Sequence, residues 1–252
     1  MSSMKLSRKE FLRLSGLCLA GLGALPLVRG WAQGDQTAGP AAKRWAMAVD
    51  TSKCRPGCTD CMLACHSLHN VPQIPNANHE VKWIWPEGYD RAFAGETHDC
   101  MNAQTKQRQV IVLCNHCDNP ACVRVCPTQA TFKRADGIVM MDYHRCTGCR
   151  YCMAACPYGA RSFNFVEPRQ YLAEIRGSYP TRTKGVVEKC NFCSERLAVG
   201  LMPACVEACK HQALIFGDRN DPDSPLRQVL QDKYSIRRKE KLGAQPNVFY
   251  LV

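Results

Sequence analysis

The spacing of its cysteines constrains what this chain can fold into more than any other feature. The 252 residues include 18 cysteines, whereas a disulfide scaffold is usually much shorter and a cytosolic enzyme of this size needs few thiols. Cys18 and Cys100 stand alone. The other cysteines form four motifs: Cys54, Cys58, Cys61 and Cys65 (motif I); Cys114, Cys117, Cys122 and Cys126 (motif II); Cys146, Cys149, Cys152 and Cys156 (motif III); Cys190, Cys193, Cys205 and Cys209 (motif IV).

Motif III has the spacing of the bacterial ferredoxin run, Cys-x2-Cys-x2-Cys-x3-Cys, and Pro157 follows it. Three thiolates two residues apart can bind three corners of an iron–sulfur cubane, and the fourth ligates the other cluster of a pair. Such motifs work two by two, so four motifs predict two pairs and four 4Fe–4S clusters. Motif IV departs most from this run, because eleven residues separate Cys193 from Cys205 and Lys210 replaces the proline.

Two other uses of cysteine fit the motifs less well. A zinc ribbon needs two Cys-x2-Cys pairs per metal and has no use for a third cysteine followed by Cys-x3-Cys. Disulfides suit an oxidising compartment, but cysteines two residues apart are poorly placed for independent bridges. A zinc-binding structural protein is therefore the alternative of another class, and its iron content would distinguish the two.

The N-terminus has the three-part layout of a signal peptide. Residues 1–13 are basic, 14–28 are moderately apolar, and small residues stand at Gly30 and Ala32, which predicts cleavage after Ala32. The run Ser-Arg-Lys-Glu-Phe-Leu resembles a twin-arginine signal with Lys9 in place of the second arginine. We therefore expect a signal peptide over 1–32, a linker over 33–44 and a periplasmic protein, with a retained N-terminal anchor as the alternative. Because twin-arginine transport moves folded proteins, clusters could be assembled before export.

The formal net charge of +11 resembles that of a nucleic-acid-binding protein. Residues 1–32 contain five basic residues and one acidic residue, so +7 is left without them. Four oxidised cubanes with their thiolates add roughly −8, because metal-bound thiols are deprotonated. The basic residues are therefore interpreted as compensation for buried anionic clusters, and no nucleic-acid partner is expected.

Residues 45–252 resemble the four-cluster electron-transfer subunits of the dimethyl sulfoxide reductase, polysulfide reductase and NrfC group. The matching segments beside the motifs are Cys-Pro-Tyr-Gly-Ala-Arg at 156–161, Val-Glu-Lys-Cys-Asn-Phe-Cys at 187–193 and the stretch 216–225. Within that group, the signal, the opening at 54–61 and the insert at 79–85 are most similar to the DsrO-type iron–sulfur subunits. Those belong to the transmembrane Dsr complex of sulfur-metabolising bacteria.

The resemblance implies an α+β fold of two ferredoxin-like modules with long loop insertions. Module A would comprise 45–108 and 162–216, module B would comprise 109–161, and 217–252 would be a C-terminal extension. The resemblance also implies four ligand sets: Cys54, Cys58 and Cys61 with Cys209; Cys190, Cys193 and Cys205 with Cys65; Cys114, Cys117 and Cys122 with Cys156; and Cys146, Cys149 and Cys152 with Cys126.

Clusters ligated only by cysteine leave no position for a substrate, and the sequence contains no nucleotide-binding glycine loop. We therefore expect an electron-transfer subunit without a catalytic site of its own. The resemblance implies three kinds of partner: an NrfD-like, quinone-reacting integral membrane subunit, a periplasmic multihaem cytochrome c and other Dsr-type subunits. These partners would hold it at the inner membrane. The alternative is the β-subunit of an exported molybdopterin reductase for a sulfur compound.

The remaining expectations concern local structure. Residues 109–113 and 138–141 are predicted strands, and each Cys-x3-Cys segment is a predicted helical turn closed by proline. The segments 66–108 and 162–186 are predicted to be long, functional or interface-forming insertions. Trp83 and Trp85 fit a docking face or a packed strand equally well. His66, His69, His79 and His98 are expected in loops or at the surface, Cys100 is expected to be a spare thiol, and the basic run 237–241 is expected to be solvated.

Overall fold

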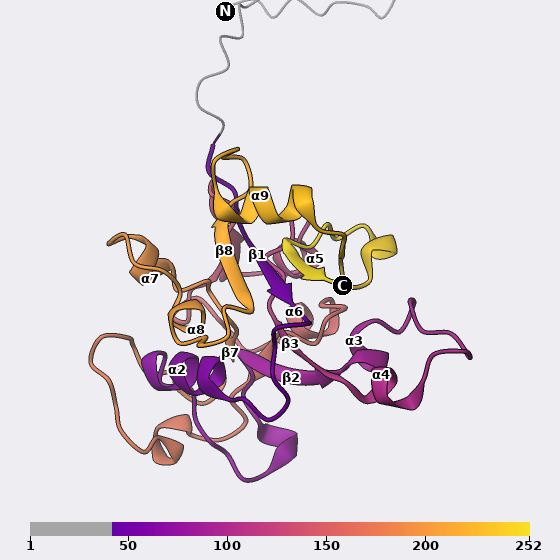
Figure 1. Cartoon of the computed structure of the whole chain (residues 1–252). Coiled ribbons are helices and arrows are strands. Elements are labelled where there is room, and N and C mark those ends of the chain that lie inside the picture. The colour runs from indigo at the N-terminus through magenta and orange to yellow at the C-terminus, as the bar shows by residue number, and fades with distance from the viewer. Residues whose placement is uncertain (1–41) are drawn as a thin grey trace, which may run out of the picture. The chain divides into compact units, whose positions relative to one another are not determined.

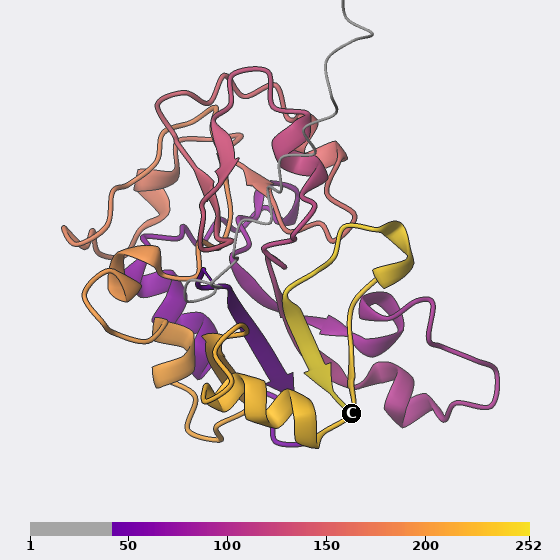
Figure 2. The same ribbon diagram turned by 90° about the horizontal axis from the view of Figure 1, so that it is seen from above.

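The largest sheet joins the beginning of the described residues to their end. The structure is a computed structural model, and it describes residues 42–252; the expected signal peptide at 1–32, Cys18 and residues 33–41 of the linker lie outside this range. Regular structure begins where the linker was expected to end. The strand order is β8 (Leu214–Asp218), β1 (Trp45–Asp50), β10 (Val248–Leu251) and β9 (Ser235–Ile236). Strand β1 is parallel to β10 and antiparallel to β8, as Figure 2 shows for β1 and β10.

Strand β1 is buried on both of its faces, which explains its nearly unbroken apolar sequence. Met47 and Val49 enter the main core, while Ala46 and Ala48 pack with Leu226 of helix α9 (Pro225–Asp232). Small side chains on that face let α9 lie close against the sheet (Figure 1). Ser224, which directly precedes α9, lies against Gly217 of β8. A side chain at position 217 would collide with Ser224 Oγ, so glycine lets the start of α9 approach the strand.

Three antiparallel hairpin pairs complete the strands. They are β2 (Ile84–Gly88) with β3 (Gln109–Leu113), β4 (Thr131–Lys133) with β5 (Val139–Met141), and β6 (Ser162–Phe163) with β7 (Val187–Glu188). Strands β3 and β5 confirm the predictions for 109–113 and 138–141. Each of these two strands precedes a cysteine motif, so the sheet pairs fix the positions from which motifs II and III start.

The helices are short, and four of the eight α-helices among residues 42–252 carry cysteines. They are α2 (Asp60–Leu68), α3 (Tyr89–Ala92), α4 (Ala103–Gln107), α5 (Ala121–Arg124), α6 (Tyr151–Ala154), α7 (Ser194–Leu197), α8 (Ala204–Glu207) and α9, with the 3-10 turns η2 (Ala77–His79), η3 (Pro168–Tyr171) and η4 (Glu240–Leu242).

The single helical turns predicted in motifs II, III and IV are confirmed as α5, α6 and α8. Motif I differs, because its helix α2 continues to Leu68. His66 follows its last cysteine, where motifs II and III have Pro127 and Pro157 and motif IV has Lys210. The mixed helix-and-strand character of the fold is confirmed. Among residues 42–252, no helix is both long and apolar enough for a membrane span.

The two insertions pack against each other, which decides between the two alternatives for Trp83 and Trp85 and corrects the expectation for His69. Trp83 is fully buried, with its indole Nε1 donating a hydrogen bond of 2.9 Å to Glu188 in β7. Trp85 is also buried, so neither tryptophan forms an exposed docking face. His69 is fully buried and stacks on Trp83 at 4.6 Å between ring centroids; its expected surface position is wrong, because the insertion 162–186 covers it.

Candidate metal centres

Two cavities within residues 42–252 are lined by cysteines. The first is lined by Cys54, Cys58 and Cys61 of motif I together with Cys209 of motif IV, and Ile111 and Leu214 supply apolar walls. The second is lined by Cys126 of motif II together with Cys146, Cys149 and Cys152 of motif III. In both cavities three cysteines of one motif meet the last cysteine of another, which is the crossed arrangement that the ferredoxin run requires.

The other eight cysteines also gather in two groups of four. Burial raises the pKa of Cys65 well above its usual value, and the neighbouring Cys190, Cys205 and Cys193 raise it further. Burial likewise raises the pKa of Cys117, and Cys114, Cys122 and Cys156 add to the effect. All 16 motif cysteines are free of disulfides, and Cys100 lies exposed and apart from them.

The local backbone explains how each motif turns its thiols toward one centre. The residue just before the second cysteine has a left-handed conformation in every motif: Gly57 (φ 78°), His116 (φ 41°), Gly148 (φ 71°) and Phe192 (φ 56°). This reverses the backbone between the first two cysteines, so that both side chains face inward. At Gly148 a side chain would also lie 2.4 Å from the carbonyl oxygen of Gly185, so no other residue fits without rearrangement.

The thiols within each group destabilise one another's ionised form. The pKa of Cys61 is raised to about 12, mainly by burial and further by the neighbouring thiols of Cys209, Cys54 and Cys58. Without a metal these thiols stay protonated, whereas a bound metal would hold them as thiolates, because metal binding deprotonates a thiol outright. Four sulfur donors in each group suit an iron–sulfur cubane or tetrahedral zinc. When bound, such a cubane supplies one-electron redox chemistry.

The protein also supplies hydrogen bonds to several of the sulfurs. The backbone N–H groups of Ala204 and Ala213 donate to Cys193 Sγ and Cys209 Sγ, at 3.4 and 3.3 Å. Burial alone would raise the pKa of Cys126, but the N–H groups of Thr131, Thr128 and Ala130 and the Thr128 hydroxyl lower it. Such donors stabilise negative charge on a ligand sulfur and thereby affect the reduction potential of a cluster.

Contacts between the motifs place the groups in a row. Cys61 of the first group and Cys65 of the second lie about one turn apart on α2. His116, next to Cys117 of the third group, stacks on Phe192, next to Cys193 of the second, at 3.7 Å between ring centroids. Helix α5, which carries Cys122 of the third group, contacts α6, which carries Cys152 of the fourth. The order is therefore Cys54/58/61/209, Cys65/190/193/205, Cys114/117/122/156 and Cys126/146/149/152. Redox centres in this order would pass electrons from one group to the next.

Two buried cations lie beside these groups, and the sequence analysis did not single them out. The Arg161 guanidinium donates to Cys122 Sγ at 3.0 Å. The ammonium group of Lys189, which is 1% exposed, donates a 2.6 Å hydrogen bond to the carbonyl oxygen of Cys190. Both residues are in segments, 156–161 and 187–193, that carry the family resemblance, but the sequence does not show which sulfurs they approach.

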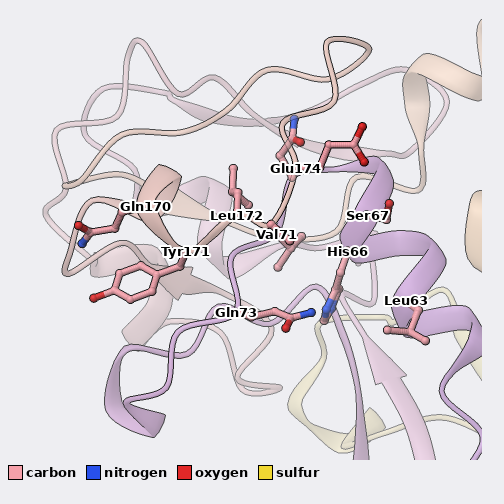
Figure 3. Close-up of a pocket in the computed structure, with 11 residues that line it drawn as sticks. Leu63, His66, Ser67, Val71, Gln73, Gln170, Tyr171, Leu172 and Glu174 are labelled. Atoms are coloured by element: carbon pink, nitrogen blue, oxygen red, sulfur yellow. The ribbon is translucent and has the colours of Figure 1, made fainter.

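A wide hollow lies away from the cysteine groups. It has a volume of about 530 Å³ and opens between α2 and η3, where Leu63 and His66 face Tyr171 and Leu172 (Figure 3). Its lining contains no cysteine and is mixed in polarity, so it is not where the metal-binding chemistry is concentrated. Nor does the set of His69, Cys193 and Glu195, whose ligand atoms lie within 4.8 Å of one another, form a separate centre, because Cys193 already belongs to the second group.

Comparisons with known proteins agree with this donor set. A family model described as a 4Fe-4S dicluster domain matches residues 107–169 and 175–219, which include motifs II, III and IV. The chain is 38% identical over 269 residues to the Hdr-like menaquinol oxidoreductase iron-sulfur subunit 1 of Archaeoglobus fulgidus, covering 97% of each protein. It is 36% identical to a subunit of the tetrathionate reductase of Salmonella typhimurium, covering 99% of this chain and 89% of the relative. It is 35% identical to the NrfC homologue of Haemophilus influenzae, covering 92% of both.

Proposed function

Because this protein belongs to the family of iron–sulfur electron-transfer subunits of oxidoreductase complexes, we propose that it relays single electrons through four 4Fe–4S clusters. The proposal rests mainly on the row of four cysteine groups. In each group, three thiols come from one motif and the fourth comes from another motif. Each group would hold one cluster with the ligand sets given in the sequence analysis. No position of such a cluster is left open for a substrate, so the protein would have no catalytic site of its own.

The composition of the purified protein tests the cluster count. The protein prepared without oxygen should be brown and contain about 16 iron atoms and as much acid-labile sulfide, on the four-cubane count. Zinc with little iron or sulfide would contradict the proposal and favour the structural zinc protein. About 8 iron atoms with full folding would indicate that two of the four groups hold no cluster.

The partners are proposed from the relatives. One relative is a subunit of a menaquinol oxidoreductase and another of a menaquinone reductase, and the NrfC homologue belongs to the same group. We infer an NrfD-like, quinone-reacting membrane subunit at one end of the row. At the other end we infer a multihaem cytochrome c, as expected for a DsrO-type subunit in a Dsr complex of a sulfur-metabolising bacterium.

A second assembly is favoured by other relatives. The matching subunits of tetrathionate reductase and of the polysulfide reductase of Wolinella succinogenes are 36% and 37% identical to this chain. They support the alternative of a β-subunit that serves an exported molybdopterin reductase acting on a sulfur compound. Affinity purification from detergent-solubilised membranes distinguishes the two assemblies: covalently bound haem in the co-purified material supports the Dsr-type complex, and molybdenum supports the reductase.

The location is also a proposal. The signal-like segment over 1–32 supports export by the twin-arginine route, and partner subunits would then hold the protein at the periplasmic face of the inner membrane. A fusion of residues 1–40 to a folded reporter should reach the periplasm, and Arg8→Ala should prevent this. Export that continues without the twin-arginine machinery would contradict the proposed route.

A further inference from the structure

Arg161 lies between two of the four cysteine groups. Its side chain is buried, with 4% of the residue exposed. The Nη2 atom donates hydrogen bonds to Cys122 Sγ at 3.0 Å and to Thr131 Oγ1 at 2.7 Å. The Nη1 atom donates to Met141 Sδ at 3.3 Å, and Met141 lines the cavity of the fourth group. Cys122 belongs to the third group in the row, so one guanidinium contacts a ligand sulfur of the third group and the cavity wall of the fourth.

The charge of Arg161 has no carboxylate to balance it. No ion pair joins the guanidinium to an acidic residue among residues 42–252. A buried, unpaired cation is strongly destabilising. The negative charge beside it must therefore come from the thiolates of the two groups, which attract the guanidinium. The cation and the two metal-binding groups thus stabilise one another.

The two motif pairs differ at this position. Arg161 is the fifth residue after the last cysteine of motif III, and Thr131 occupies the same position after motif II. Thr131 accepts from Arg161 and donates from its hydroxyl to the carbonyl oxygen of Met140 at 3.0 Å, which holds the guanidinium in place. In the other pair the equivalent residues are Asn70 and Leu214. Leu214 lines the cavity of Cys54 and Cys209 with apolar atoms, and Asn70 donates to the carbonyl oxygens of Arg176 and Tyr179.

Other cations near the first two groups do not reproduce this arrangement. Lys189 is buried near Cys190, but its ammonium group donates to the carbonyl oxygens of Val139 and Cys190, not to a sulfur. Burial raises the pKa of Cys54, and Arg108 lowers it by a smaller amount. Arg108 is exposed to solvent, which screens its charge. Arg161 is therefore a direct, buried donor to a ligand sulfur of the third group that also contacts the cavity wall of the fourth.

We propose that Arg161 sets the reduction potentials of the clusters in the third and fourth groups, holding both above the values they would have without it. The inference rests on the proposed function, because it requires clusters in these groups. Reduction adds one electron, and therefore one negative charge, to a cubane. The fixed positive charge of arginine stabilises that added charge, and burial strengthens the interaction. No proton is released or taken up by Arg161 when a cluster is reduced, because its guanidinium stays protonated in both states.

An electron paramagnetic resonance redox titration of the full chain with its clusters tests this inference. In Arg161→Met, two of the four clusters should become at least tenfold harder to reduce, a downward shift of about 59 mV or more for a one-electron couple. The other two clusters should keep their potentials. Arg161→Lys, which keeps the charge, should shift the same two clusters by less. Arg124→Gln is the matched control, because Arg124 lies on α5 between Cys122 and Cys126 but is exposed to solvent, and it should change none.

Two results would overturn the role of Arg161. One is an Arg161→Met protein with full iron content and four unchanged potentials. The other applies if Arg161→Met cannot bind its clusters, in which case Thr131→Val and Arg161→Lys would be titrated instead. Thr131→Val removes the hydroxyl that holds the guanidinium but removes no charge. Unchanged potentials in both variants would reject the inference. A wild-type protein with zinc and little iron would instead reject the proposed function, so the two failures are distinguishable.

Discussion

The indole of Trp83 and the carboxylate of Glu188 form a hydrogen bond of 2.9 Å in the core of the protein. These residues are 105 positions apart, and each lies in or beside one of the two long insertions. Arg182 donates to the same carboxylate from Nε at 2.7 Å, and Arg182 and Glu188 are at most 1% exposed. The arginine also donates to the carbonyl oxygens of His69 and Asn70. The insertions therefore form a polar core that supports the ligand-bearing helix α2 and strand β7.

Removing one partner of this buried ion pair should destabilise the protein strongly. In Arg182→Met, Glu188 loses its cation and keeps a buried charge, which typically costs about 3–5 kcal/mol. The expected result is a markedly lower unfolding midpoint in guanidinium chloride. The control is Arg169→Met, because the Arg169–Glu167 pair is exposed by 46% and 42% and such pairs contribute about 0–1 kcal/mol. Equal stability of the two variants would show that the buried network does not support the fold.

Gly148 should be irreplaceable in motif III, while Gly159 should tolerate alanine. Both have positive φ, 71° and 63°. A side chain at Gly148 would lie 2.4 Å from the Gly185 carbonyl oxygen, whereas nothing lies within 4 Å at Gly159. Gly148→Ala should therefore lose the cluster of the fourth group, measured as a loss of about four iron atoms per chain. Gly159→Ala should keep its iron and lose only about 1 kcal/mol of stability. Equal iron contents would contradict the close approach at Gly148.

The crossed ligand sets predict that the two motif pairs fail separately. Cys149→Ala should damage the clusters of motifs II and III and leave motifs I and IV able to hold iron, because ligands cross over only within a pair. Cys193→Ala should do the reverse. Motif I must pair with motif IV over a long loop, which adds roughly 1–2 kcal/mol of closure entropy, so Cys193→Ala should harm folding at least as much. Electron paramagnetic resonance with iron analysis checks both variants, and loss of the same signals in both would refute the pairing.

Asp50 should stabilise the fold at neutral pH and lose this effect only in strong acid. Burial alone would raise the pKa of Asp50, but hydrogen bonds from Ser52 and Lys233 outweigh it and lower the pKa to about 2. A carboxylate with a lowered pKa stabilises the fold above its unfolded pKa of 3.8, and the effect is lost as the pH falls through about 2. The half-exposed Lys233 is partly screened by solvent, so we expect about 1–2 kcal/mol.

Denaturant unfolding of Asp50→Asn and the wild type measures this contribution. The difference in the free energy of unfolding should be constant between about pH 5 and 8, because Asp50 is fully ionised there in both states. Lys233→Met removes the cation alone and should account for part of the difference. The difference should then decrease as the pH falls from about 4 toward 2, and a difference that stayed constant down to pH 2 would mean that the pKa of Asp50 is not lowered.

Local structure around the motifs could be predicted because it depends on neighbouring residues. Apolar, β-branched runs at 109–113 and 138–141 become strands β3 and β5. The Cys-x3-Cys segments of motifs II, III and IV become single helical turns. The surface position expected for His69 was wrong, and of the two alternatives for Trp83 the packed position holds, because the burial of both residues depends on residues more than 100 positions away.

The spacing of the cysteines is sufficient to predict the donors: 16 thiols at ferredoxin spacings specify sulfur donors in sets of four, because the reach of a short loop is set by the number of residues between ligands. The surroundings of those donors depend on the folding of the whole chain. The approach of Arg161 to Cys122, the burial of Lys189 beside Cys190 and the order of the four groups all depend on side chains brought together from distant segments. Electrostatic interactions follow distance in space and burial, and neither can be read from positions along the sequence.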